Sequence, residues 1–165
     1  MKTPYRYSMN MTRTSGREVV RSLAGKDLNE SGAVVNLVVT GNSRFYDYSF
    51  IENELETWTK YNEYPDLVIV GGASGVDYLA ERWAENLNIP IAVFSEAWQQ
   101  PRQSDGTDSG RPEASNDLPH MMLENATHLL AFPGPGSVWT NRMIEIAKEM
   151  NIPTIVVELP MDEHE

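Results

Sequence analysis

The chain has no cysteine among its 165 residues. Disulfide bonds, thiolate catalysis and cysteine-ligated metal sites are therefore excluded, and an intracellular protein is favoured over a secreted disulfide scaffold. The chain also has only three histidines. His120 and His128 lack ligand spacing with any carboxylate pair, and His164 lies in an acidic tail. We therefore expect neither a metal ion nor a cofactor.

Long apolar runs are also missing. No segment approaches the length that spans a membrane, and the N-terminal MKTPYRYSMNMTRTSG has polar residues where a signal peptide needs its apolar core. We expect a soluble protein without a membrane partner, located in the cytoplasm, or in the host cytoplasm if a phage encodes it. A chain of 18.6 kDa is expected to form one domain with a sizeable core.

Positive charge is scarce and unevenly placed. Residues 1–32 hold six of the 13 basic residues but only three of the 24 acidic ones, so the rest of the chain carries a charge of −14. A field of this sign repels DNA, which makes nucleic acid an unfavourable partner. We expect residues 1–32 to form a partly disordered arm, residues 33–160 the folded domain and residues 161–165 an acidic tail. An arm that contacts another subunit or nucleic acid is the alternative.

The body alternates short β-branched runs with helical periodicity, which is typical of βα units around a parallel sheet. One apolar stripe runs from Val76 to Leu87 at helical spacing, a second from Thr140 to Met150, and a less regular one surrounds Leu55. A short helix is expected to start near Pro112, with Pro119 restarting or kinking it. The five predicted strands are residues 33–40, 66–70, 89–94, 127–132 and 153–159. The prediction is an α/β fold, a single Rossmann-like open and mainly parallel five-stranded sheet flanked by helices.

Two segments of the chain echo each other. AENLNIPIAVF and AKEMNIPTIVV each end a helix at asparagine, pass through Ile-Pro and enter a strand. Proline cannot continue a helix and disfavours helical geometry at the residue before it. Both segments therefore predict the same turn from helix to parallel strand.

Glycine-rich turns follow three of the predicted strands. GNSR follows the first strand, GGASG the second and PGPGS the fourth. Because the carboxyl ends of parallel strands share one edge of the sheet, the three turns should converge where open α/β sheets bind ligands. Glycine lets backbone N–H groups approach an anion, and the following helix N-termini add partial positive charge. The alternative is that these turns only connect strands tightly to helices.

Side chains near these turns suit an anion. Each turn contains a serine, namely Ser43, Ser74 and Ser137. Of the seven basic residues beyond residue 32, four lie in or beside these turns or in the long polar segment after the third strand: Arg44, Arg102, Arg111 and Arg142. An acidic protein that gathers its arginines in this way favours phosphate there. The Lys of a P-loop and the third glycine of GxGxxG are both absent, so neither assignment is supported.

Four motifs together resemble a known family. VTGNSRFYDYSFIENELETW, VIVGGASGVDYLAERWAENLNIPI, FSEAW and ATHLLAFPGPGS are similar to the SLOG superfamily of Rossmann-like domains. They are closest to its small stand-alone group, common in phages and bacteria, with GSR, GGAxGaD and FPGxGT-like motifs. Relatives include the Lonely Guy phosphoribohydrolases and the DNA-processing protein A. The resemblance covers about residues 34–158.

The resemblance implies a site for a nucleotide-derived small molecule and a homodimer or higher homo-oligomer. An aromatic side chain at Trp98 could stack on a base, or it could anchor the loop. The matching positions predict ligand contacts at Gly41, Ser43, Arg44, Gly71, Gly72, Ala73, Gly75, Asp77, Gly134, Gly136 and Ser137. The expected binding set further includes Asn42, Ser74, Arg111, Asn116, Pro133, Val138, Trp139 and Thr140.

Departures from the phosphoribohydrolase pattern argue against catalysis. The PGGxGTxxE motif places a carboxylate close to its threonine, whereas here the first acid after Ser137 is Glu145, about two helical turns away. Ser137 has no identifiable base, so a serine nucleophile is not expected. The usual Arg-Asn pair before the fourth strand reads Ser115-Asn116, with Arg111 as the nearest cation. We therefore expect no catalytic residue.

Three functions remain open. The first is a non-catalytic sensor or sequestering protein for an ADP-ribose-like or cyclic-nucleotide-type signal, in the setting of phage–host conflict. The second is a nucleotide N-glycosidase that uses Asp77 or Glu145 in an unfamiliar geometry. The third is a DNA-handling module, which the charge of −14 opposes.

Overall fold

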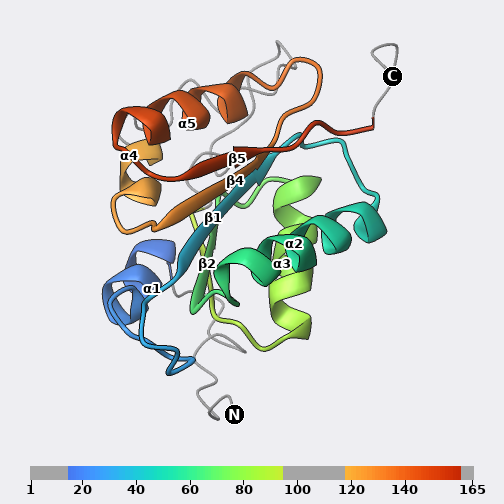
Figure 1. Cartoon of the computed structure of the whole chain (residues 1–165). Coiled ribbons are helices and arrows are strands. Elements are labelled where there is room, and N and C mark those ends of the chain that lie inside the picture. The colour runs from blue at the N-terminus through green and yellow to red at the C-terminus, as the bar shows by residue number, and fades with distance from the viewer. Residues whose placement is uncertain (1–14, 95–117, 161–165) are drawn as a thin grey trace.

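The computed structural model describes residues 15–94 and 118–160. Within them, five parallel strands form one sheet in the order β3-β2-β1-β4-β5 (Figure 1). The strands are β1 (Asn36–Gly41), β2 (Leu67–Val70), β3 (Ile91–Val93), β4 (His128–Phe132) and β5 (Thr154–Val156). The helices are α1 (Gly16–Leu23), α2 (Tyr48–Asn62), α3 (Val76–Asn86), α4 (Leu118–Leu123) and α5 (Val138–Glu149). The predicted Rossmann-like open parallel sheet flanked by helices is confirmed.

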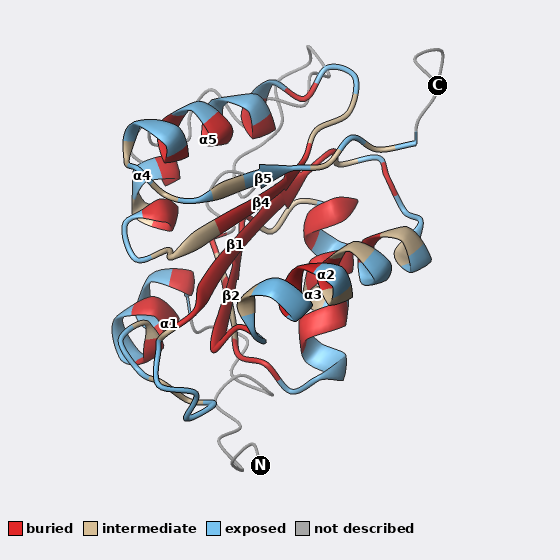
Figure 2. Cartoon of the chain, viewed as in Figure 1, coloured by how far each residue is buried: buried red, intermediate tan, exposed pale blue. Residues whose placement is uncertain are grey.

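The sheet is buried between two layers of helices. One hydrophobic cluster joins the sheet to α1, α4 and α5, and the other joins it to α2 and α3. Successive side chains of a strand face opposite sides of the sheet. In β1, Leu37 and Val39 therefore belong to the second cluster and Val38 belongs to the first. Figure 2 shows the central strands as a buried band with exposed residues mainly on the outer helix faces and at β5. An apolar run without polar alternation is what such a sheet requires.

Helix α1 was not predicted, because residues 1–32 were assigned to an arm. Ser15 caps the helix through a reciprocal capping box with Glu18, and Val19, Val20 and Leu23 lie in the core. The helix covers the edge of the sheet so closely that a Cβ on Gly16 would lie 2.6 Å from the carbonyl oxygen of Val93. The described part of the arm therefore belongs to the folded domain. Residues 1–14 lie outside the described residues.

The echoed segments form the same turn twice. Asn88 and Asn151 adopt left-handed φ angles of 60° and 63°. In the first turn the N–H of Ile89 donates to the carbonyl of Ala84 at 2.9 Å, and in the second the N–H of Ile152 donates to that of Ala147 at 2.9 Å. These are the bonds of a Schellman motif, in which a left-handed residue closes the helix. Each turn then delivers a strand parallel to the others.

Two predicted elements differ at their ends. The fourth helix starts at Leu118, with Pro119 in its first turn, where a missing N–H costs no helical bond. The predicted start near Pro112 lies outside the described residues. The last strand was predicted over 153–159 but spans only Thr154–Val156, because it is the edge strand and pairs with β4 alone. No helix in the described ranges has the length and apolarity to cross a membrane.

The packing of α1 can be tested directly. We expect Leu23→Ala to lower the free energy of unfolding by about 2–4 kcal/mol, because a fully packed leucine is truncated. Ser22→Ala, on the exposed side of the same helix, should change it by less than about 0.5 kcal/mol. Urea unfolding followed by circular dichroism measures both. Equal stability of the two variants would restore the interpretation of this segment as an arm.

Glu81 on α3 gives the fold a dependence on pH. Burial raises its pKa from 4.5 to about 7, and the charge of Glu85 adds to the rise. The folded protein thus keeps a proton that the unfolded chain loses between pH 4.5 and 7. The stability contributed by this protonated carboxyl is fully present below pH 4.5 and is lost as the pH rises through 7.

We expect Glu81→Gln to raise the melting temperature at pH 8 and to leave it nearly unchanged at pH 4. The substitution removes a half-buried negative charge that destabilises the folded state at high pH. Glu85→Gln is the control, because it removes only the repulsion and should give a smaller gain. Thermal melts of the three proteins across this range measure the effect. A gain of the same size at both pH values would contradict it.

Candidate functional site

Three loops meet at the carboxyl edge of the sheet, as predicted. We call them the β1 loop (residues 42–47), the β2 loop (residues 71–75) and the β4 loop (residues 133–137). Since β1 pairs with β2 on one side and with β4 on the other, the β1 loop lies between the other two (Figure 1). The strand order reverses at this point, which is where open α/β sheets place their ligands.

The β1 and β2 loops are bonded together. The N–H of Val76 donates to the carbonyl of Asn42 at 3.1 Å, and the hydroxyl of Ser74 donates to the carbonyl of Ser43 at 2.9 Å. Gly75 packs directly against this backbone with φ +70°, and any Cβ would collide with the Asn42 carbonyl. Glycine is therefore required at residue 75 by both conformation and space.

The side chain of Asn42 ties the β1 loop to the β4 loop. Its Nδ2 donates to the hydroxyl oxygen of Ser137 at 3.3 Å and to the carbonyl of Pro135 at 3.5 Å. Its Oδ1 accepts the N–H of Arg44 at 2.7 Å. A Cβ on Gly134 would lie 2.7 Å from this Nδ2, so the close approach of the two loops depends on glycine there. Asn42 is buried, and its amide serves the protein itself.

Ser137 is also bonded inside the protein. Only 1% of the residue is exposed, and its hydroxyl oxygen accepts the N–H of Gly134 at 2.9 Å in addition to the bond from Asn42. It is the N-cap residue of α5, yet its side chain makes no capping bond to the helix. The hydroxyl oxygen thus shapes the β4 loop, and the ligand contact expected at Ser137 stays a prediction.

Asp77 plays the matching part in the β2 loop. Its Oδ2 accepts the N–H of Gly71 at 3.1 Å and the N–H of Ala73 at 3.3 Å, and the residue is 3% exposed. Two of the five backbone N–H groups of the β2 loop thus donate to an acidic side chain of the same loop region. The carboxylate is directed into its own loop.

The N-terminus of α5 keeps unbonded donors. The first helical bond runs from Asn141 to the Ser137 carbonyl, and within the described ranges no acceptor meets the N–H groups of Trp139 and Thr140. No acidic residue lies in this first turn. Trp139 and Thr140 are both buried, and Trp139 belongs to the core. The space beside Gly136 is open.

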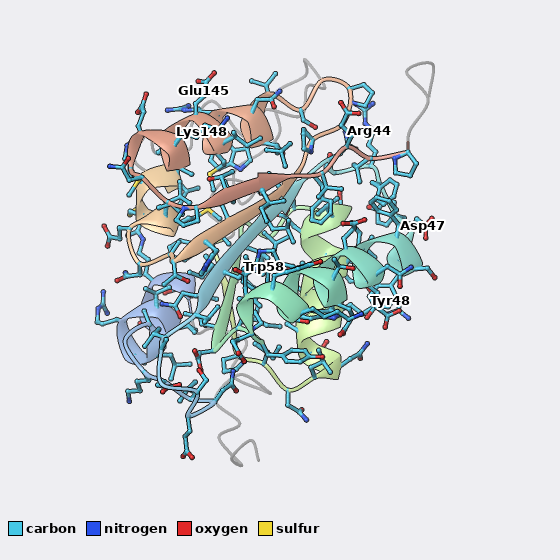
Figure 3. All side chains as sticks on the ribbon, in the orientation of Figure 1. Arg44, Asp47, Tyr48, Trp58, Glu145 and Lys148 are labelled. Atoms are coloured by element: carbon cyan, nitrogen blue, oxygen red, sulfur yellow. The ribbon has the colours of Figure 1, made fainter. Side chains whose placement is uncertain are left out.

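Charged side chains are distributed unequally around this helix end. In Figure 3, Arg44 lies toward the carboxyl edge, whereas Glu145 and Lys148 lie further along α5. Arg44 is exposed, and its backbone is held to Asn42. Arg142 is exposed on α5. The first acid of α5 is thus removed from the loops in the structure as well as in the sequence.

The remaining predicted contacts divide into three groups. Gly41 is buried at the end of β1, where a Cβ would lie 2.7 Å from Val76. Pro133 and Gly72 are half-buried, and Val138 is 56% exposed at the start of α5. The last group lies outside the described residues and is not placed: Trp98, Arg111 and Asn116.

Of the described histidines, His128 lies away from the three loops. His128 starts β4 at the opposite edge, with its ring 5.2 Å from that of Trp58, and burial lowers its pKa. His120 is exposed on α4. Among residues 15–94 and 118–160, no group of three or more candidate metal ligands is found.

The fold and the three joined loops define a Rossmann-like domain with its candidate ligand site at the strand switch. Residues 35–100 match the family described as YAcAr, the YspA, cpYpsA-related SLOG family. The match supports SLOG superfamily membership, which the four motifs indicated, and suggests a nucleotide-related ligand-binding or phosphoribohydrolase-like domain. It spans the β1 and β2 loops but not the β4 loop. Neither a curated protein nor a solved structure gives a significant match.

The structural role of Ser137 is testable without a ligand. We expect Ser137→Ala to lower the free energy of unfolding by about 1–3 kcal/mol, because Gly134 N–H and the Asn42 amide lose a buried acceptor. Ser74→Ala, which removes one exposed hydroxyl bond, should cost no more than about 1 kcal/mol. Denaturant melts of ligand-free protein give both values. A neutral effect of Ser137→Ala would contradict the structural role of this hydroxyl.

Proposed function

We propose that the protein binds a phosphorylated, nucleotide-derived small molecule without transforming it, as a sensor or a sequestering protein. The observation that carries the proposal is the N-terminus of α5, which offers backbone donors and no acid in its first turn. Backbone N–H groups at a helix N-terminus attract anions through their partial positive charge. The family match supports the nucleotide-related part of the proposal.

The joined loops support binding by a site that exists before the ligand arrives. Asn42, Ser137 and Asp77 are each buried and bonded to loop backbone, so ordering these loops costs little when a ligand binds. Arg44 adds an exposed cation near the same edge, where its guanidinium can pair with a phosphate in two places. ADP-ribose-like and cyclic-nucleotide-type molecules are the class that this arrangement suits.

The structure supports the glycosidase alternative less well. Asp77 is buried and bonded to its own loop, and Glu145 lies along α5 beyond the first turn. Assistance to a departing base requires an acid within hydrogen-bond reach of it. Neither Asp77 nor Glu145 meets this condition at the N-terminus of α5.

We expect calorimetry to detect binding of at least one molecule among ADP-ribose, its cyclic forms, NAD and nucleoside monophosphates. Arg44→Gln should weaken that binding by about tenfold, because it removes a charge-assisted bond to phosphate. Lys148→Gln removes the same charge further along α5 and should leave the affinity unchanged. Mass spectrometry of molecules released by heating the purified protein identifies a natural ligand.

Two results would overturn the proposal. One is the absence of both a co-purified nucleotide and any heat of binding across this panel. The other is free base accumulating during incubation with a nucleotide and disappearing in Asp77→Asn or Glu145→Gln, which would establish the glycosidase.

A further inference from the structure

The two edges of the sheet differ in how they are covered. Strand β3 lies beside α1, which packs so closely that a Cβ on Gly16 would lie 2.6 Å from the carbonyl oxygen of Val93. Strand β5 pairs with β4 on its inner side, and no described residue pairs with its outer side. Ile155 is 49% exposed and Val156 is 45% exposed, and β5 contains no buried residue (Figure 2). Strands of parallel sheets are normally buried, so an apolar edge strand with this exposure is unusual.

The outer side of β5 carries unbonded backbone groups. The carbonyl of Pro153 and the N–H of Val157 each bond to β4 at 2.9 Å. The backbone groups of successive residues in a strand point to opposite sides, so Thr154 and Val156 direct their N–H and C=O groups outward. Each of these two residues therefore offers one donor and one acceptor to a further strand.

The exposed edge lacks the features that keep edge strands apart. Such strands are usually protected by a charged side chain, a proline or a bulge. Residues 154–157 contain neither charge nor proline, and β5 keeps a regular register with β4. In a chain with a net charge of −11, most surfaces repel a second copy. The uncharged strand is a place where two copies meet without bringing like charges together.

We propose that two copies of the chain associate through β5, which pairs antiparallel with β5 of the partner subunit around a two-fold axis. The pairing joins two five-stranded sheets into one continuous sheet and covers Ile155 and Val156 in both copies. The resemblance to a family implies a homo-oligomer but no surface for it, and the exposed edge supplies that surface. The inference is independent of the ligand in the proposed function.

The outward backbone groups determine the register of the pairing. Two residues that face each other with outward groups exchange both bonds in an antiparallel pair. With the axis at Ile155, Thr154 lies opposite Val156 of the partner subunit, and both pairs of this kind are bonded. Ile155 then faces Ile155 of the partner subunit in a non-hydrogen-bonded pair, with the two Cα atoms about 4.5 Å apart.

This register also separates the charges. Glu158 is the nearest charged residue along the chain, three residues from the axis. At the rise of a β-strand, the two copies of Glu158 are about 20 Å apart. This exceeds the screening length of about 8 Å at physiological ionic strength, so their repulsion does not oppose the pairing.

The mass of the full-length protein in solution tests the association. Light scattering after gel filtration should give the wild type twice the chain mass of 18.6 kDa. Ile155→Lys should weaken the association at least about a hundredfold, because two lysines would face each other at the axis. Leu87→Lys is the matched control, since Leu87 is an exposed aliphatic residue at the end of α3, and this variant should keep the wild-type mass. Circular dichroism verifies that both variants are folded.

Single cysteines test the register. The chain has no cysteine, so an introduced thiol reports on one position only. Under a mild oxidant such as diamide, Ile155→Cys should form a linked dimer at least about tenfold faster than Val156→Cys, because the two copies of residue 156 are diagonal neighbours about 7–8 Å apart. Leu87→Cys measures the rate of random collision. Gel electrophoresis without reductant follows all three.

Three outcomes would overturn the inference. The first is a wild type that stays monomeric at about 0.1 mM, a concentration at which even a weak dimer is populated. An edge occupied by another protein, or by another segment of this chain, gives this result. The second is Ile155→Lys with the mass of the wild type. The third is Val156→Cys forming linked dimers as fast as Ile155→Cys.

Discussion

The buried amide of Asn42 is the interaction on which the candidate site depends. Strand β1 has β2 on one side and β4 on the other, so the residue directly after β1 borders both neighbouring loops. Asn42 uses that position fully, with its carbonyl bonded to Val76, its Nδ2 to Pro135 and Ser137, and its Oδ1 to the next turn of its own loop. A single residue, through its side chain and its backbone carbonyl, thereby joins three loops that are far apart in the sequence.

Polar side chains hold the loops at the carboxyl edge of the sheet together, and backbone groups are left to bind a ligand. The polar side chains of Asn42, Ser137 and Asp77 each bond loop backbone, which satisfies buried groups that would otherwise be costly. The donors that remain at α5 belong to the main chain. In the proposed site, backbone donors would recognise the ligand.

The sequence predicts the sheet and the convergence of the loops because both follow from patterns along the chain: β-branched runs, helical stripes and glycine after each strand. The inward turn of Ser137 and Asp77 could not be predicted, since sequence gives a residue's place in a loop but not the side that it faces. Helix α1 could have been found, because Gly16, Val19, Val20 and Leu23 have helical spacing and Ser15 and Glu18 form a capping-box pattern. The basic charge of this segment favoured an arm instead. The roles predicted for Trp98, Arg111 and Asn116 stay predictions.

The two Asn-Ile-Pro turns have a consequence for the order of folding. They share the same left-handed asparagine and the same bonds, although one leads into the strand that α1 covers and the other into the exposed edge strand. Their geometry is therefore encoded by neighbouring residues and does not wait for burial. Contacts separated by only a few residues close with little loss of chain entropy. Both turns can form before the sheet assembles, and each then determines the direction in which its strand joins.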